Sequence, residues 1–116
     1  MTRAKVLKIP ARGEWSFDEV ELEGDGGIPL KTLQDAVGGW IERWGFAVFD
    51  MFIHEEDKLR QLPFNPVATR VSGILAHGDC IVGNAIVCAH DGEGKPVGLS
   101  DGQELELRRM LREAGF

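Results

Sequence analysis

The chain has 116 residues, of which 43% are hydrophobic, and its formal net charge is −6. A chain of this length can bury roughly 65% of its unfolded surface, so it needs no metal or disulfide to fold. The negative charge argues against direct binding of nucleic-acid phosphates, and no run of about 18 apolar residues could span a membrane. The short apolar stretch after the basic N-terminus is too brief for a secretory signal. We therefore expect one cytoplasmic domain over residues 1–116.

The first part of the chain predicts a β-hairpin followed by a short helix. A strand is expected at Ala4–Ile9 and another at Ser16–Glu23, where apolar and acidic residues alternate with the period of a half-buried strand. Pro29 suits the first position of a helix of about two turns, and Gly38-Gly39 ends it. So short a helix is marginal alone and must pack on a sheet.

The next stretch is strongly apolar and aromatic, and predicts two strands or one bent strand. We place them at Trp40–Trp44 and Phe46–His54, with Gly45 marking a turn or a bulge between them. A polar turn is expected at Glu55–Lys58. The aromatic residues exceed what one strand face can bury, so we expect some of them to be exposed and to form an interface with a partner or a second copy. They are Trp40, Trp44, Phe46, Phe49 and Phe52.

The segment from Glu55 to Pro66 fixes the backbone through its prolines and its asparagine. Asn65 is a favourable helix N-cap, and Pro66 fits the first turn because its missing N–H would be unpaired there anyway. A buried stripe follows at helical spacing, with Gly73 leaving the far end of the helix open. The stripe consists of Val67, Ala68, Val71 and Leu75.

Cys80–Ala89 is apolar on both faces, which predicts a central β-strand. Along such a strand Cys80 and Cys88 would lie roughly 26 Å apart, whereas a disulfide requires Cα atoms within about 7 Å. We expect two separate thiols that pack as small buried hydrophobes in a reducing compartment.

A glycine-rich turn, a brief strand at Val97–Leu99 and a final helix complete the chain. Ser100 and Gln103 fit a capping box at the start of that helix. Together these elements predict an α+β fold: one small, mostly antiparallel sheet of about four to six strands, with two or three short helices packed on it.

Four blocks of the sequence occur together in a distinctive order and spacing: Val37–Glu42, His54–Leu59, Leu62–Ala68 and Ile81–Val87. In these blocks the chain resembles the domain of unknown function 3846 family, a family of small proteins from phages, plasmids and their bacterial hosts. Where the family would carry Tyr, Gly and Asp, this chain has Trp40, Asp57 and Asn84. The resemblance implies an origin in a mobile element or its host, and it implies no particular activity.

Two asparagines are candidate ligand-binding residues. Asn84 would lie mid-strand, where a buried amide costs roughly 1–3 kcal/mol unless it finds partners, so either a neighbouring loop satisfies it or it faces a pocket. Gly83 beside it would permit a bulge or a close backbone approach. Asn65 could read a ligand with its amide, although its role as a helix cap explains it without a ligand.

His77, Asp79 and Cys80 combine an imidazole, a carboxylate and a thiol, so His77 and Asp79 are further ligand-binding candidates. A Cys–His nucleophile is imaginable here, but the sequence shows no oxyanion element, and loop residues beside a buried cysteine are the simpler interpretation. The histidines and cysteines have no zinc spacing, and the glycine-rich segments lack phosphate-loop patterns. We therefore predict no metal and no cofactor.

Glu19, Glu21 and Glu23 line one face of a predicted strand near Asp25. Regular negative charge can imitate the phosphates of nucleic acid, but a solvated sheet face is the simpler interpretation.

These observations favour a small non-catalytic binding module from a phage or other mobile element, which acts on a host protein or a small ligand. One alternative is a small hydrolase or transferase that uses His77, Asp79 and Cys80. A third is an acidic mimic of nucleic acid that acts on a host protein. We expect no membrane contact and no direct binding to nucleic acid, and a homodimer would be compatible with the aromatic excess.

Overall fold

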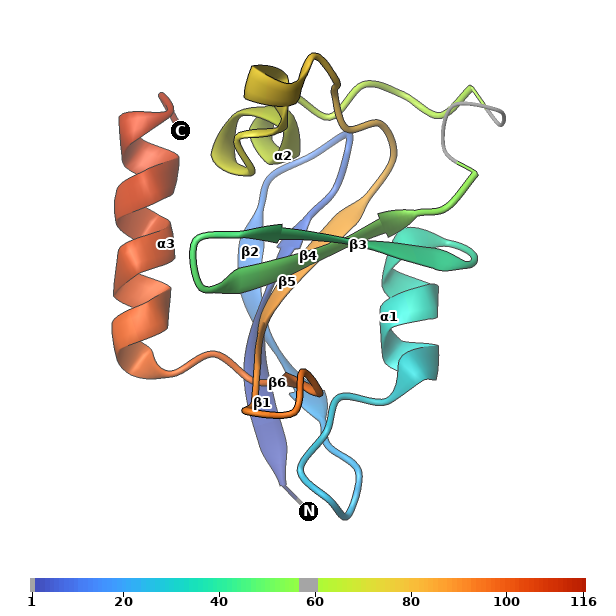
Figure 1. Ribbon diagram of the computed structural model, residues 1–116, viewed down its shortest axis with the longest axis vertical. Helices are drawn as coiled ribbons and strands as arrows, with labels where there is room; N and C mark the ends of the chain where they lie inside the picture. Colours follow the sequence, from blue (N-terminus) through green and yellow to red (C-terminus); the bar gives the residue numbers. More distant parts are fainter. Residues whose placement is uncertain (1, 57–60) are drawn as a thin grey trace.

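The computed structural model describes residues 2–56 and 61–116. It is an antiparallel sheet with helices on both faces, so the predicted α+β fold class is confirmed (Figure 1). The order across the sheet is β2-β1-β5-β4-β3, with the short β6 pairing on β5. The strands are β1 (Arg3–Ile9), β2 (Ser16–Glu21), β3 (Ile41–Phe46), β4 (Phe49–His54), β5 (Ala85–His90) and β6 (Pro96–Val97). The helices are α1 (Leu30–Val37), α2 (Pro66–Val71), the 3₁₀ helix η1 (Ile74–His77) and α3 (Asp101–Glu113).

The predicted first hairpin and the helix that follows it are both present. β1 and β2 pair antiparallel, although β2 ends two residues earlier than expected. Pro29 directly precedes α1 rather than opening it, and Gly38 caps the helix with a positive φ of 90°. Its N–H donates to the carbonyl of Gln34, which is the left-handed cap that a glycine provides at low cost.

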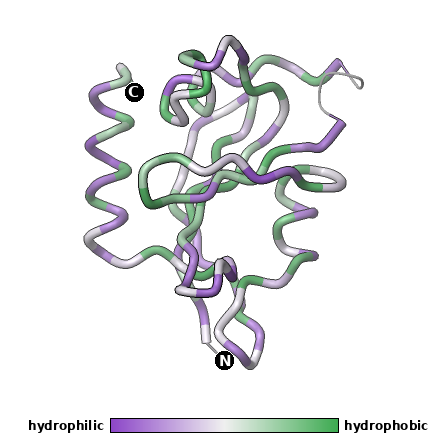
Figure 2. The backbone as a smooth tube through the Cα atoms, viewed as in Figure 1, coloured by the Kyte–Doolittle hydropathy of each residue, from purple (hydrophilic) through white to green (hydrophobic). Residues whose placement is uncertain are grey.

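The sheet is covered on both faces, because α1 lies on one side while α2 and α3 lie on the other (Figure 1). Figure 2 shows α1 and α3 as helices in which hydrophilic and hydrophobic residues alternate along the length. Every residue of β4 is buried, since its side chains alternate between two apolar layers. This arrangement buries Phe46, Phe49 and Phe52 and partly buries Trp44. Of the five aromatic residues from which exposed ones were expected, only Trp40 is therefore strongly exposed.

The turn between β3 and β4 lies at Ala47 and Val48, so the prediction of an interruption at Gly45 is wrong. Gly45 pairs with Asp50 inside the ladder. Ala47 has a φ of +49°, which an alanine adopts rarely. A two-residue hairpin requires a positive φ at its turn, and the register of the buried aromatic residues places that turn at Ala47.

The predicted central strand Cys80–Ala89 is too long at its start. β5 is indeed central in the sheet, but it covers only Ala85–His90. Gly83 has a φ of +77° and donates its N–H to the carbonyl of Pro63, which turns the preceding segment out of the sheet. The 2.7 Å hydrogen bond to Pro63 is the close backbone approach expected there, and a Cβ at Gly83 would also lie 2.9 Å from the side-chain atom Leu62 Cδ1.

The helix after Asn65 is shorter than its apolar stripe suggests. α2 ends at Val71, and Gly73, with a φ of +73°, starts η1 in a new direction. Ala68 and Val71 are buried as predicted, whereas Leu75 is 57% exposed, so its assignment to the core is wrong. The change of helix axis at Gly73 breaks the spacing on which that assignment depended.

The capping box at the start of α3 is present in both directions. The hydroxyl of Ser100 accepts from the N–H of Gln103, and the Gln103 side chain accepts from the N–H of Ser100. Leu107 and Leu111 of α3 are fully buried against the sheet.

The predicted polar turn at Glu55–Lys58 is seen at Glu55 and Glu56, while Asp57 and Lys58 lie outside the described residues. Among the described residues, no helix combines the length and the apolar character that crossing a bilayer demands.

Candidate functional site

Two clefts open beside β3, one toward each face of the sheet. The first, which we call the Trp40 cleft, has a volume of about 490 Å³ and lies at the end of α1. The second, the Cys80 cleft, has a volume of about 330 Å³ and lies between the β3–β4 hairpin and the segment after α2. The Trp40 cleft is lined by Gln34, Asp35, Gly38, Gly39 and Trp40. The Cys80 cleft is lined by Glu42, Arg43, Trp44, Ile53, Ile74, His77, Asp79 and Cys80.

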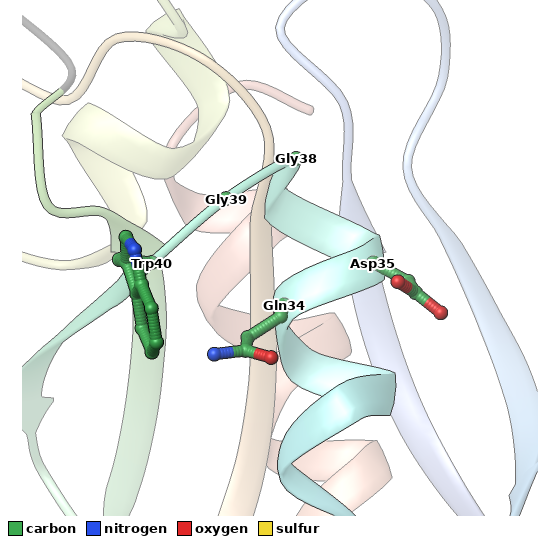
Figure 3. Close-up of a pocket in the computed structure, with 5 residues that line it drawn as sticks. All are labelled: Gln34, Asp35, Gly38, Gly39 and Trp40. Atoms are coloured by element: carbon green, nitrogen blue, oxygen red, sulfur yellow. The ribbon is translucent and has the colours of Figure 1, made fainter.

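The Trp40 cleft places an aromatic face opposite an amide. In Figure 3 the Gln34 side chain extends from α1 toward the Trp40 ring, whereas Asp35 points to the other side of the helix. The Asp35 carboxylate is held by Lys31 at 3.3 Å. The cleft therefore offers one apolar surface and one group that can both donate and accept a hydrogen bond.

The backbone that carries Trp40 is tightly fixed, although 66% of the residue's surface is exposed. The N–H groups of Gly38 and Gly39 both donate to the carbonyl of Gln34, and the carbonyl of Trp40 accepts from the N–H of Glu55 at 2.8 Å. Beneath this turn lies the buried His54, whose Nε2 is only 2.4 Å from where a Cβ on Gly39 would stand. The glycine is thus required by the close approach of the imidazole.

The Cys80 cleft brings together three of the residues flagged from the sequence. His77 packs edge-on against Trp44, with 5.1 Å between the ring centres, and the indole N–H of Trp44 donates to the carbonyl of Ser72. These contacts join η1 to β3. His77 and Asp79, together with Cys80, therefore lie around one concave surface, across from Glu42 of β3.

The two thiols have different environments. Cys80 is partly exposed, and its N–H donates to the Asp79 carboxylate at 2.8 Å, so the expectation that it is a buried hydrophobe is wrong. Cys88 lies inside the sheet, where burial and then the nearby Asp50 carboxylate raise the pKa of its thiol to about 12. Both cysteines are free, as predicted.

Asn65 is the helix cap that the sequence predicts, whereas the expected mid-strand position of Asn84 is wrong. Asn65 is completely buried: its oxygen accepts from the N–H of Ala68, and its amide donates to the carbonyls of Ile9 and Gly83. Each of these hydrogen bonds joins the Asn65 side chain to the backbone and so stabilises the fold. Asn84 does not lie mid-strand but is exposed, because Gly83 turns the chain before β5 begins.

Asn84 accepts a hydrogen bond from the N–H of Ala11 at 2.9 Å and borders a separate surface groove with Lys8 and Glu14. The structure therefore brings His77 and Asp79 together and leaves Asn65 and Asn84 elsewhere. The side chains of the two asparagines fasten the chain after β1 to the segment before β5.

The acidic residues of β2 are matched by cations of β1. The guanidinium of Arg3 lies 3.6 Å from the Glu19 carboxylate and 3.9 Å from that of Glu21. On the opposite face of the strand, Asp18 lies 3.6 Å from Lys8. These cations reduce the field that a row of carboxylates would otherwise present.

The comparison with protein families now identifies the chain. It belongs to the family described as domain of unknown function 3846 (DUF3846), whose model matches residues 4–112. The resemblance recognised in the four sequence blocks is thereby confirmed. No curated protein and no solved structure matches the chain.

Gln34 and Glu42 were not identified as site residues from the sequence. Gln34 is one polar residue in an amphipathic helix, and nothing local distinguishes it from any other solvated position. The available signal was the glycine pair followed by an aromatic residue, because a helix that ends at Gly38-Gly39 directs the next side chain back over its own last turn.

Proposed function

We propose that this protein is a small non-catalytic binding module that recognises a host protein or a small ligand at the surface around Trp40. The observation that carries the proposal is the contrast between a fixed backbone and an exposed ring at this residue. A tryptophan that loses little freedom on binding can contribute a large apolar contact, which is why this residue type is common among the dominant contacts of interfaces.

The surroundings of Trp40 support recognition by contact. Gln34 stands across the cleft and can orient a polar group of the bound molecule through its amide. The backbone hydrogen bonds of Gly38, Gly39 and Trp40 hold the supporting turn in place, with His54 close beneath Gly39, so the cleft is formed without a ligand. Preformed sites bind with a smaller entropic cost than sites that must be ordered by the ligand.

We further propose that the protein is encoded by a phage or another mobile element, as the sequence resemblance implies, and that it acts in the cytoplasm of its host. The exposed Trp40 would also be compatible with a homodimer contact, which is a weaker candidate than a heterologous partner because one tryptophan buries little area by itself.

Native mass spectrometry of the protein purified from its own host tests this function. We expect the wild-type chain to retain an additional mass, either a small molecule or a protein, and the Trp40→Ala variant to lose it. Leu105→Ala is the matched control, since Leu105 is an equally exposed apolar residue on the far helix α3. Wild-type protein without an added mass, or a mass that Trp40→Ala retains in full, would contradict the proposal.

A second candidate is a small hydrolase or transferase, favoured by the position of Cys80. Cys80 is a partly exposed residue rather than a core residue, and it shares a cleft with His77 and Asp79. Such an enzyme would use Cys80 as nucleophile and His77 as base. The Cys80→Ser and His77→Ala variants should then each abolish turnover of a thioester or ester probe. Equal turnover by wild type and both variants would exclude this role.

A further inference from the structure

β3 is an edge strand whose outward-facing backbone groups have no partner among the described residues. The two-residue turn makes Phe46 and Phe49 a hydrogen-bonded pair, so alternate residues of β3 direct their N–H and C=O groups away from β4. These residues are Ile41, Arg43 and Gly45. No hydrogen bond within residues 2–56 and 61–116 reaches their outward groups.

The two clefts stand on opposite faces of this edge. Trp40 and the end of α1 lie on the face covered by α1, whereas the Cys80 cleft opens on the face covered by α2 and η1. Successive side chains of a strand point to opposite faces of its sheet. A strand added beside β3 would therefore place alternate side chains toward the Trp40 cleft and toward the Cys80 cleft.

The charged side chains beside the β3 edge indicate what kind of side chains an added strand would carry. Glu42, Glu55 and Glu56 are exposed and form no ion pair with any described residue. Glu42 lines the Cys80 cleft, and Glu55 is hydrogen-bonded to the turn that carries Trp40. The cation of the strand itself, Arg43, is already directed to the buried Asp50 at 3.7 Å. Among residues 2–56 and 61–116, these three carboxylates therefore leave the edge with negative charge that no described cation pairs.

We propose that β3 accepts an extended basic segment of a partner protein as an additional strand of the sheet. The main-chain groups of Ile41, Arg43 and Gly45 would pair with the segment, and its basic and apolar side chains would alternate between the two clefts. Main-chain pairing supplies affinity in this mode of recognition, while pockets for alternate side chains supply specificity. The inference rests on the proposed binding function and names its partner class and its mode.

The test uses a short capped peptide of alternating lysine and valine as the probe, with the full chain as receptor. We expect the peptide to bind and to slow amide hydrogen exchange at Ile41, Arg43 and Gly45. A peptide of the same sequence, N-methylated at alternate residues, keeps the charge but loses the main-chain donors, and it should bind about tenfold more weakly. A peptide of alternating glutamate and valine should not bind.

Gly45→Pro provides the matching change on the protein. Proline removes the outward N–H of Gly45 without touching a bond to β4, which is the position where an edge strand tolerates it. A Cβ at this site would meet only ordinary contacts, the nearest at 3.7 Å from Asp50. The variant should lose about tenfold in affinity for the lysine–valine peptide, and the methylated peptide tests the same bond should the variant not fold.

Three outcomes would overturn the inference. One is binding without slowed exchange at the three amides, and another is equal binding of the acidic peptide. The third is slowed exchange that grows with protein concentration in the absence of peptide, which would identify a second copy as the occupant. A Trp40-dependent mass from the host, found together with any of these, would leave the binding function standing and reject strand addition alone.

Discussion

The two edge strands of the sheet, β2 and β3, differ in how side chains cover their outward backbone groups. At the β2 edge, Arg3 donates to the main-chain carbonyl of Glu19 and also pairs with the carboxylates of Glu19 and Glu21. At the β3 edge, no described side chain reaches the outward backbone groups, and a cleft opens on either face. Proteins commonly blunt exposed edges with charge because an open edge pairs with other chains. The β2 edge follows that practice, whereas no hydrogen bond from a described residue reaches the outward backbone groups of the β3 edge.

The charge that an edge presents depends more on where the compensating cations lie than on the number of carboxylates. The carboxylates of β2 form the more regular row in the sequence, yet cations of β1 stand beside them. Glu42 is a single carboxylate of β3, and no described cation compensates it. The acidic pattern alone would point to the β2 face as the functional surface, whereas the contacts of the two edges lead us to propose the β3 edge.

The largest expected effect comes from removing the buried amide that joins α2 to the end of β1 and to the segment before β5. Asn65→Ala should lower the free energy of unfolding by about 3 kcal/mol, because it strips a helix cap and leaves two buried carbonyls without donors. Urea unfolding measures this. Asn84→Ala is the control, since it removes one exposed hydrogen bond and should cost about 0.5 kcal/mol. Equal losses for the two variants would contradict the assignment.

The next largest loss of stability is expected at the turn that carries Trp40. Gly39→Ala forces a Cβ toward the buried His54 and should destabilise the fold by about 2 kcal/mol. Gly38→Ala meets open space and suffers only from its positive φ, so about 1 kcal/mol is expected. Thermal unfolding of both variants gives the comparison. A milder effect at Gly39 than at Gly38 would show that the imidazole does not fix this turn.

The reactivity of the two cysteines should distinguish the cleft beside β3 from the core. At neutral pH iodoacetamide should alkylate Cys80, while Cys88 should react only after unfolding. Mass spectrometry of the peptides measures both reactions. Rapid alkylation of Cys88 in the folded protein would contradict the core as described.

The buried thiol of Cys88 leads us to expect a loss of stability at high pH. Its pKa in the folded protein, about 12, lies above its ordinary value of 9.0, so the folded state keeps the proton that the unfolded state releases. This contribution to stability is complete below pH 9 and is lost as the pH rises toward 12. Cys88→Ala should show a smaller decrease over that range in urea unfolding, and an identical decrease would reject the prediction.

The smallest effect is expected at the β2 edge. Arg3→Ala should lower the free energy of unfolding by about 0.5 kcal/mol, because exposed ion pairs contribute little. Urea unfolding at two salt concentrations measures it. A loss above about 2 kcal/mol would mean that this edge depends on Arg3 far more than the contacts indicate.

Local chemistry made part of the fold predictable. The caps at Asn65 and Ser100, the glycine stop at Gly38 and the β1–β2 hairpin follow from residue types at fixed spacing, and the structure confirms each. The errors occurred where tertiary packing decided between local options. Ala47 takes a turn conformation that the sequence would assign to Gly45, because the register of the buried aromatic residues requires it.

The candidate site was only partly predictable. The association of His77, Asp79 and Cys80 was visible in the sequence because the residues are neighbours. Their position across from Glu42 depends on how η1 packs against β3, which no local pattern reveals. Trp40 was noted as one of five aromatic residues, and only the two-sided cover of the sheet singles it out as the exposed one.

The most direct measurement follows the amide resonances of both edges while the lysine–valine peptide is added. Phe17, Glu19 and Glu21 serve as the internal comparison, because the pairing of Leu22 with Thr2 directs their N–H groups outward from β2. We expect the resonances of Ile41, Arg43 and Gly45 to shift in a saturable way, while those of Phe17, Glu19 and Glu21 remain in place. Saturable shifts at β2 with none at β3 would contradict it.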